Sequence, residues 1–135
     1  MENKDSPAAR RAGDARVSSL RQSLVRLREE ISQLLDVFML GTPLVRGSVY
    51  ELRTKCGKPT CACAMRGALH SCTVITWSEN GRKRLRSLSP KESMELTRLT
   101  ENHRRFRRAR ARLVELNAKV LALVDKLAEA RRQEP

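Results

Sequence analysis

Apolar residues recur at alternating spacings of three and four positions near the start of the chain. The repeat consists of Val17, Leu20, Leu24, Leu27, Ile31, Leu34 and Phe38. This spacing places them on one helical face and predicts a coiled-coil helix over residues 15–40, with Asp14 as its N-cap. Gly41 in a left-handed conformation, followed by Pro43, is expected to end it. Residues 1–14 are mostly small, polar or charged, and we expect them to be disordered.

The same alternation returns in the last third of the chain. The second set comprises Leu99, Asn102, Phe106, Ala109, Leu113, Leu116, Val120, Leu123, Leu127 and Ala130. In "SPKE", Ser89 and Glu92 can form a capping box around Pro90 at the first helical position, which predicts a long basic helix over residues 90–132. A helix of this length needs a partner. We expect it to pair antiparallel with the first helix, which is shorter and so leaves part of the second seam for another chain.

Between the two helices, residues 44–88 favour a small β-sheet. The predicted strands are 47–54, 72–78 and 82–88. Asn80-Gly81 is a strong two-residue hairpin signal between the last two strands. Trp77 is expected to be the main packing residue of the sheet. The predicted fold class is therefore α+β: two long helices as an antiparallel coiled coil, with a three-stranded antiparallel sheet and a Cys/His loop at one end.

All four cysteines lie in "KCGKPTCACAMRGALHSC", residues 55–72, together with one of the two histidines. The candidate metal donors are Cys56, Cys61, Cys63, His70 and Cys72, which is one more than a tetrahedral site needs. Clustered soft donors of this kind indicate zinc, and four ligands would close its coordination sphere and make the site structural. The close pair has C-x-C rather than C-x-x-C spacing, so a reduced cluster without metal and a Cys61/Cys63 redox pair stay open as alternatives.

The stretch "VYELRTKCGKPTCACA", with the glycine, histidine and basic hairpin that follow it, resembles an uncharacterised prokaryotic family of small cysteine-bearing domains. The family pattern runs approximately K-C-G-K-P-x-C-x-C-A, then G, then H-G-P-Y, and the resemblance covers residues 46–106. It implies that the ligands are Cys56, Cys61, Cys63 and His70. Here "HSCT" replaces His-Gly-Pro-Tyr and "TVITW" replaces an aromatic strand, which argues against a surface that stacks on single-stranded bases.

The net charge of +13 is unevenly distributed along the chain. Residues 82–112 hold twelve Lys/Arg against three Asp/Glu, whereas residues 113–135 hold four of each. Such a cluster is typical of a surface that contacts a polyanion, and arginine suits phosphate groups. A solvated helix exterior, a membrane surface and an acidic protein are the alternatives. The candidate phosphate-contacting residues are Arg82, Lys83, Arg84, Arg86, Arg104, Arg105, Arg107, Arg108, Arg110 and Arg112.

These observations predict a non-catalytic accessory protein that binds nucleic acid, DNA or RNA, through its phosphate backbone and carries a structural zinc loop. The alternative is a coiled-coil adaptor that forms a homodimer or recruits a protein partner. No catalytic triad, carboxylate pair or phosphate-binding glycine loop is present, so we expect no enzyme activity. No run of about twenty apolar residues exists, so we expect a cytoplasmic protein without a membrane partner.

Overall fold

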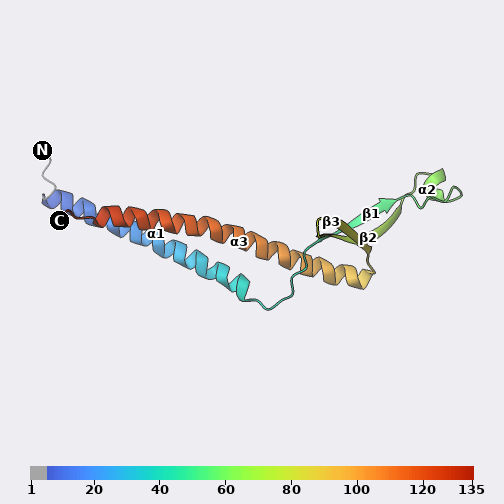
Figure 1. Cartoon of the computed structure of the whole chain (residues 1–135), viewed down its shortest axis with the longest axis horizontal. Helices are drawn as coiled ribbons and strands as arrows, with labels where there is room; N and C mark the ends of the chain where they lie inside the picture. Colours follow the sequence, from blue (N-terminus) through green and yellow to red (C-terminus); the bar gives the residue numbers. More distant parts are fainter. Residues whose placement is uncertain (1–5) are drawn as a thin grey trace. The chain divides into compact units, whose positions relative to one another are not determined.

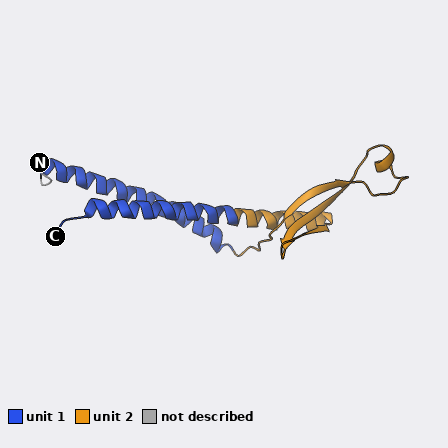
Figure 2. Cartoon of the chain, turned by 45° about the horizontal axis from the view of Figure 1, so that its top comes forward, with its two compact units in different colours: residues 1–40, 107–135 blue, residues 41–106 orange. Residues whose placement is uncertain are grey.

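The computed structural model describes residues 6–135, which fall into two compact units (Figures 1 and 2). Unit 1 contains Met1–Leu40 and Arg107–Pro135, and unit 2 contains Gly41–Phe106. The elements follow the order α1, β1, α2, β2, β3, α3, so two long helices enclose a small sheet in the sequence. The predicted α+β class and the three-stranded antiparallel sheet are confirmed.

Helix α1 spans Pro7–Met39 and starts about two turns before the predicted position. The Ser6 hydroxyl caps it by accepting a hydrogen bond from the Ala9 backbone N–H at 3.2 Å. The expectation of disorder is therefore wrong for residues 7–14, because serine as N-cap and proline at the first helical position already define a helix start. Residues 1–5 of that prediction lie outside the described part of the chain.

The end of α1 also differs from the prediction. Leu40, the C-cap residue, has φ −65° and ψ 129°, so the chain leaves the helix in an extended conformation. Gly41 is not among the glycines with positive φ. The helix therefore ends without a left-handed glycine, and Leu40 is the first residue in an extended conformation.

Helix α3 spans Pro90–Arg131 and carries the second apolar repeat. Ala109 and Leu116 are buried, with Leu116 fully so at 0 % exposed. Every other position of that repeat is half-buried, as is every position of the α1 repeat. Within unit 1, the Arg112 guanidinium donates to Glu30 of α1, with an N–O distance of 2.7 Å. The predicted faces of both helices are thus their least exposed ones.

The sheet of unit 2 has the order β1-β2-β3, with β1 at Ser48–Thr54, β2 at His70–Glu79 and β3 at Arg82–Ser87. Both neighbouring pairs are antiparallel. The β2–β3 turn is formed by Asn80 and Gly81 with φ of 49° and 76°, and two positive φ values are what a type I′ hairpin turn requires. The hairpin prediction is correct. Strand β2 begins two residues earlier than predicted.

The core of unit 2 is small and centres on β2. Val74, Ile75 and Thr76 are buried there, and Thr100 of α3 is buried in the same unit. Trp77, the predicted main packing residue, is only half-buried, whereas the smaller β-branched residues before it are buried on both faces of the strand. The expectation that Trp77 is the main packing residue of the sheet stays a prediction.

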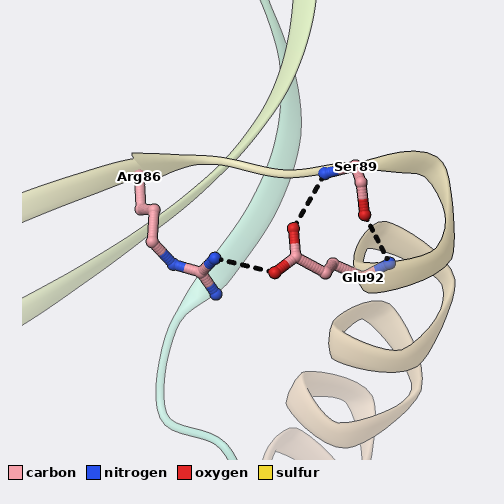
Figure 3. A network of polar contacts seen from close by, with 3 residues as sticks. All are labelled: Arg86, Ser89 and Glu92. Carbon is pink, nitrogen blue, oxygen red and sulfur yellow. Dashed lines mark hydrogen bonds and ion pairs between the residues drawn. The ribbon is translucent and has the colours of Figure 1, made fainter.

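The predicted capping box is present where α3 begins (Figure 3). The Ser89 hydroxyl accepts from the Glu92 backbone N–H at 3.2 Å, and the Glu92 carboxylate accepts from the Ser89 backbone N–H at 2.9 Å. Arg86 of β3 donates to the other carboxylate oxygen at 3.0 Å. The Ser89 N–H and then Arg86 hold the pKa of Glu92 below its usual range. This stabilisation is present above the ordinary carboxyl pKa and is lost as the pH falls through the lowered one.

Replacing Ser89 with alanine is expected to destabilise the protein by about 1 kcal/mol, because the Glu92 backbone N–H loses its acceptor at the helix start. Thermal unfolding followed by circular dichroism measures the change. Glu92→Gln is the matched control, because glutamine also completes a capping box and removes only the exposed Arg86 ion pair. A Ser89→Ala protein that melts with the control would show that this cap contributes nothing.

Candidate metal centre

The loop between β1 and β2 holds the sequence-predicted donors. It lies at the end of the two strands and contains the short helix α2, Ala62–Met65 (Figure 1). Cys56 follows β1 by two residues, and His70 is the first residue of β2, where it pairs with Thr54. The sheet therefore holds the first and last donors close together, and the loop between them supplies the other two.

Four donor atoms converge at this point. The sulfurs of Cys56, Cys61 and Cys63 and a ring nitrogen of His70 all lie within 4.8 Å of one another. The Cys56 and Cys63 sulfurs are 3.5 Å apart, and the Cys61 sulfur is 3.1 Å from His70 Nε2. In a tetrahedral zinc site, with ligand distances of about 2.0–2.3 Å, neighbouring donors are about 3.5–4 Å apart. The four side chains already approach this spacing.

The loop backbone brings the donors together through two left-handed glycines. Gly57 and Gly67 have φ of 79° and 69°, a region that other residues rarely adopt, and Gly57 directly follows the donor Cys56. Cys61 donates its N–H to the Lys58 carbonyl at 3.1 Å and is the N-cap residue of α2. Helix α2 was not predicted. It turns Cys63 inward, where its side chain is 1 % exposed.

The electrostatics of the loop favour thiolates at two of the three cysteines. The Lys58 backbone N–H, followed by the Cys63 and Cys61 side chains, lowers the pKa of Cys56. The Cys63 backbone N–H and then His70 lower the pKa of Cys61. The Cys56 N–H also pulls the pKa of Cys63 down, but burial and the two neighbouring sulfurs outweigh it and raise that pKa. The three cysteine side chains thus favour a bound cation, which would reduce the repulsion between their sulfurs.

Cys72 does not belong to this group. It lies two residues beyond His70 on β2, pairs with Leu52 and is exposed. Two residues of strand span about 6–7 Å, which carries its sulfur away from the loop. Of the five donors that the sequence offered, the structure therefore brings together the three cysteines and the histidine that the family resemblance implied.

The donor set fits a closed Cys₃His site. Zn²⁺ with three thiolates carries one negative charge, and residues 55–70 contain Lys55, Lys58 and Arg66 but no carboxylate. A zinc ion would complete its usual four ligands with these side chains and keep no position for water, as in structural sites. A metal ion held by these side chains would cross-link the two ends of the loop.

Comparison with known proteins supports the sequence resemblance. The family described as Domain of unknown function (DUF6788) matches residues 17–98, which is more than half of the chain. The chain belongs to this family. The match runs from the apolar repeat of α1 through the whole sheet and Cys/His loop into the start of α3 of this DUF6788 protein. No curated protein and no solved structure matches it.

The predicted phosphate-contacting residues lie on two elements of the DUF6788 protein. The four on β3 are exposed, as are five of the six on α3. Arg112 is half-buried between Glu30 and Glu115, which accept from it at 2.7 and 2.9 Å. This ion-paired arginine is better explained as a bridge between α1 and α3 than as a phosphate contact. None of the described helices has the length and hydropathy needed to cross a membrane.

The structure also assembles a basic groove in unit 2 that the sequence did not predict. It is lined by Arg46, Gly47, Ser48, Thr76, Trp77, Ser78, Lys83 and His103. The lining residues come from the segment before β1, from all three strands and from α3. The sheet register and the return of α3 bring them together, so no local pattern in the sequence could have indicated this groove.

Proposed function

We propose that this DUF6788 protein is a non-catalytic, nucleic-acid-associated accessory protein with a structural zinc loop. The observation that carries the proposal is the run of exposed arginines on α3, at Arg104, Arg105, Arg107, Arg108 and Arg110. The scaffold is an antiparallel coiled coil of α1 and α3. In support of that pairing, one surface groove is lined by Leu27 of α1 and Leu123 of α3.

The zinc loop has a structural role in this proposal. Apart from the buried Cys63, residues 55–70 are exposed or half-buried, so the loop has little apolar surface with which to fold. A cross-link by metal is the usual way in which so small a segment becomes ordered. The three thiolates and the imidazole support zinc as the ion, because zinc is the usual metal of closed Cys/His sites.

The arginine run has the properties of a phosphate-binding surface. The side chains of Arg105, Arg107 and Arg110 make no hydrogen bond or ion pair within residues 6–135. Like charges one turn apart repel each other on a helix, and an anion would remove that repulsion. Guanidinium groups bind phosphate oxygens through paired hydrogen bonds. The three side chains are therefore expected to contact nucleic acid backbones.

Fluorescence anisotropy with labelled single-stranded and duplex oligonucleotides tests the proposal. The affinity is expected to fall steeply with potassium chloride, because each neutralised phosphate releases counterions. Replacing Arg105, Arg107 and Arg110 with glutamine should reduce the slope of log K against log salt by roughly two to three for duplex DNA. The slope reports the number of phosphate contacts that are lost, and the three exposed substitutions are not expected to alter the fold.

The matched control is the glutamine variant of Arg16, Arg21 and Arg28, which are exposed on α1 and have the same total charge. It should keep the wild-type slope. Equal losses in both triple variants would mean that net charge alone attracts the oligonucleotide. No detectable binding by the wild type at low salt would contradict the proposed function.

A second candidate function is that of a coiled-coil adaptor. The observation that favours it is a stripe of exposed apolar side chains on α3, at Val114, Leu121 and Val124. These positions lie outside the predicted seam, whose residue Leu116 is buried. If the stripe recruits a second copy, Leu121→Asp should convert a dimer into a monomer in analytical ultracentrifugation.

A further inference from the structure

Each helix of unit 1 carries a second set of apolar side chains beside its seam, the three-four repeat predicted from the sequence. Each member directly follows a seam position. The set on α1 is Val25, Leu35 and Met39, and the set on α3 is Val114, Leu121 and Val124. All six are between 42 and 83 % exposed. Because valine is a weaker helix former than most residues, exposed valines are poor choices for a helix surface that only meets water.

The contacts between the two helices place both sets on one side of unit 1. In both views α1 lies beside this part of α3 (Figures 1 and 2). The positions directly before the seam meet on one side, in a groove lined by Ser23, Arg26, Lys119, Ala122 and Lys126 around Leu27 and Leu123. The ion pair of Glu30 with Arg112 joins two more such positions. Since a helix turns about 100° per residue, the positions directly after the seam share the opposite side.

The two sides differ in chemistry. The side before the seam carries Arg26, Lys119, Lys126 and the ion pair between the helices. The side after the seam is uncharged on α3 over about four turns, at the exposed residues Val114, Asn117, Leu121, Val124 and Ala128. These five again alternate by three and four, the spacing that a further helix–helix contact needs. On α1, Arg28 and Ser32 interrupt the apolar set, so α3 provides the centre of this face.

The charge of this part of the chain favours a second copy as its partner. Residues 113–135 contain four Lys/Arg and four Asp/Glu, so two copies do not repel each other there. An acidic protein or an anionic membrane would be attracted instead to residues 82–112, which hold twelve Lys/Arg against three Asp/Glu. Asn117 is the one strongly polar side chain of the face on α3. Its amide both donates and accepts, so it can pair with the same group of an identical partner and set the register.

We infer that two copies of the protein pack together through this face, with α3 at the centre of the contact and α1 beside it. The product is a four-helix bundle made of two two-helix units. The inference rests on the second candidate function, the coiled-coil adaptor, and names a second copy of the chain as its partner. In such a two-fold interface the same patch serves on both copies, so every substitution enters it twice.

Sedimentation equilibrium of the full chain tests the inference, because it measures the dissociation constant of the dimer. Leu121→Asp and Val25→Asp should each raise this constant by about a hundredfold or more, since each buries two carboxylates in an apolar contact. Ala122→Asp is the matched control. Ala122 is also exposed and follows Leu121, but it lines the groove on the other side, so its variant should keep the wild-type constant. All three positions are exposed, so the variants should remain helical in circular dichroism.

Three results would overturn the inference. A wild type that stays monomeric at every concentration would also remove the second candidate function, while its oligonucleotide affinity would decide the first one separately. A dimer that Leu121→Asp dissociates and Val25→Asp does not would exclude α1 from the contact and leave the stripe on α3 as the adaptor surface. Equal dissociation by Ala122→Asp would show that added charge, and not this face, controls the association.

Discussion

Cys63→Ser is expected to abolish metal binding by the protein and to unfold the loop between β1 and β2. Cys63 is the most buried donor of the group, 3.5 Å from the Cys56 sulfur, and also accepts the Cys56 backbone N–H at 3.4 Å. A serine hydroxyl is neutral and binds zinc far more weakly than a thiolate. Structural zinc sites contribute apparent binding free energies of about 10–16 kcal/mol at neutral pH, so losing one of four ligands has a large effect.

Native mass spectrometry of the reduced protein measures the loss directly. The wild type should carry a single zinc ion per chain, and the Cys63→Ser protein should carry none. Cys72→Ser is the matched control, because it makes the same chemical change at an exposed cysteine outside the group. The assignment of the four ligands would be refuted if the reduced wild-type protein bound no added zinc. It would also be refuted if the Cys72→Ser protein lost as much zinc as the Cys63→Ser protein.

Leu116→Asp is expected to unfold most of the two-helix unit. Leu116 is 0 % exposed, and the substitution both removes a packed side chain and buries a carboxylate without a partner. The cost is about 3–5 kcal/mol or more. Since small proteins are stable by only about 5–15 kcal/mol, this is a large share of the total. Urea denaturation followed by helical circular dichroism should show the midpoint falling sharply.

Leu121→Asp provides the comparison for that experiment. Leu121 lies on the same helix but is 64 % exposed, so its replacement by aspartate should leave the unfolding midpoint of the monomer nearly unchanged. A Leu116→Asp protein as stable as the Leu121→Asp protein would show that the apolar repeat of α3 is not covered in solution. The antiparallel coiled coil would then have to be abandoned.

The elements that the sequence predicted well are those whose signals are local. The three-four repeat, the capping box at Ser89 and the Asn80-Gly81 turn each lie within a few residues, and each has one dominant conformational solution. The four candidate metal donors could also be predicted from the sequence, because they are close together in the chain and cysteine and histidine are typical metal ligands. Ser6 was overlooked as a cap because Asp14 lies nearer to the first residue of the apolar repeat.

The features that the sequence did not predict depend on the sheet. Trp77 has the largest apolar side chain of its strand, but the buried positions of that strand are Val74 to Thr76. The ligand choice between His70 and Cys72 was settled by where β2 begins, and strand ends are poorly defined by sequence. His103 of α3 lines the groove only because the helix returns to the sheet after the hairpin.

The pairing of His70 with Thr54 connects the candidate metal site to the register of β1 and β2. A small sheet with both edges open and few buried side chains has little to hold its strands in one alignment. Sliding β1 along β2 by a single residue would exchange the faces of every side chain and separate Cys56 from His70. A metal ion bound at the loop would therefore fix the register, because only one alignment of β1 and β2 keeps all four donors together.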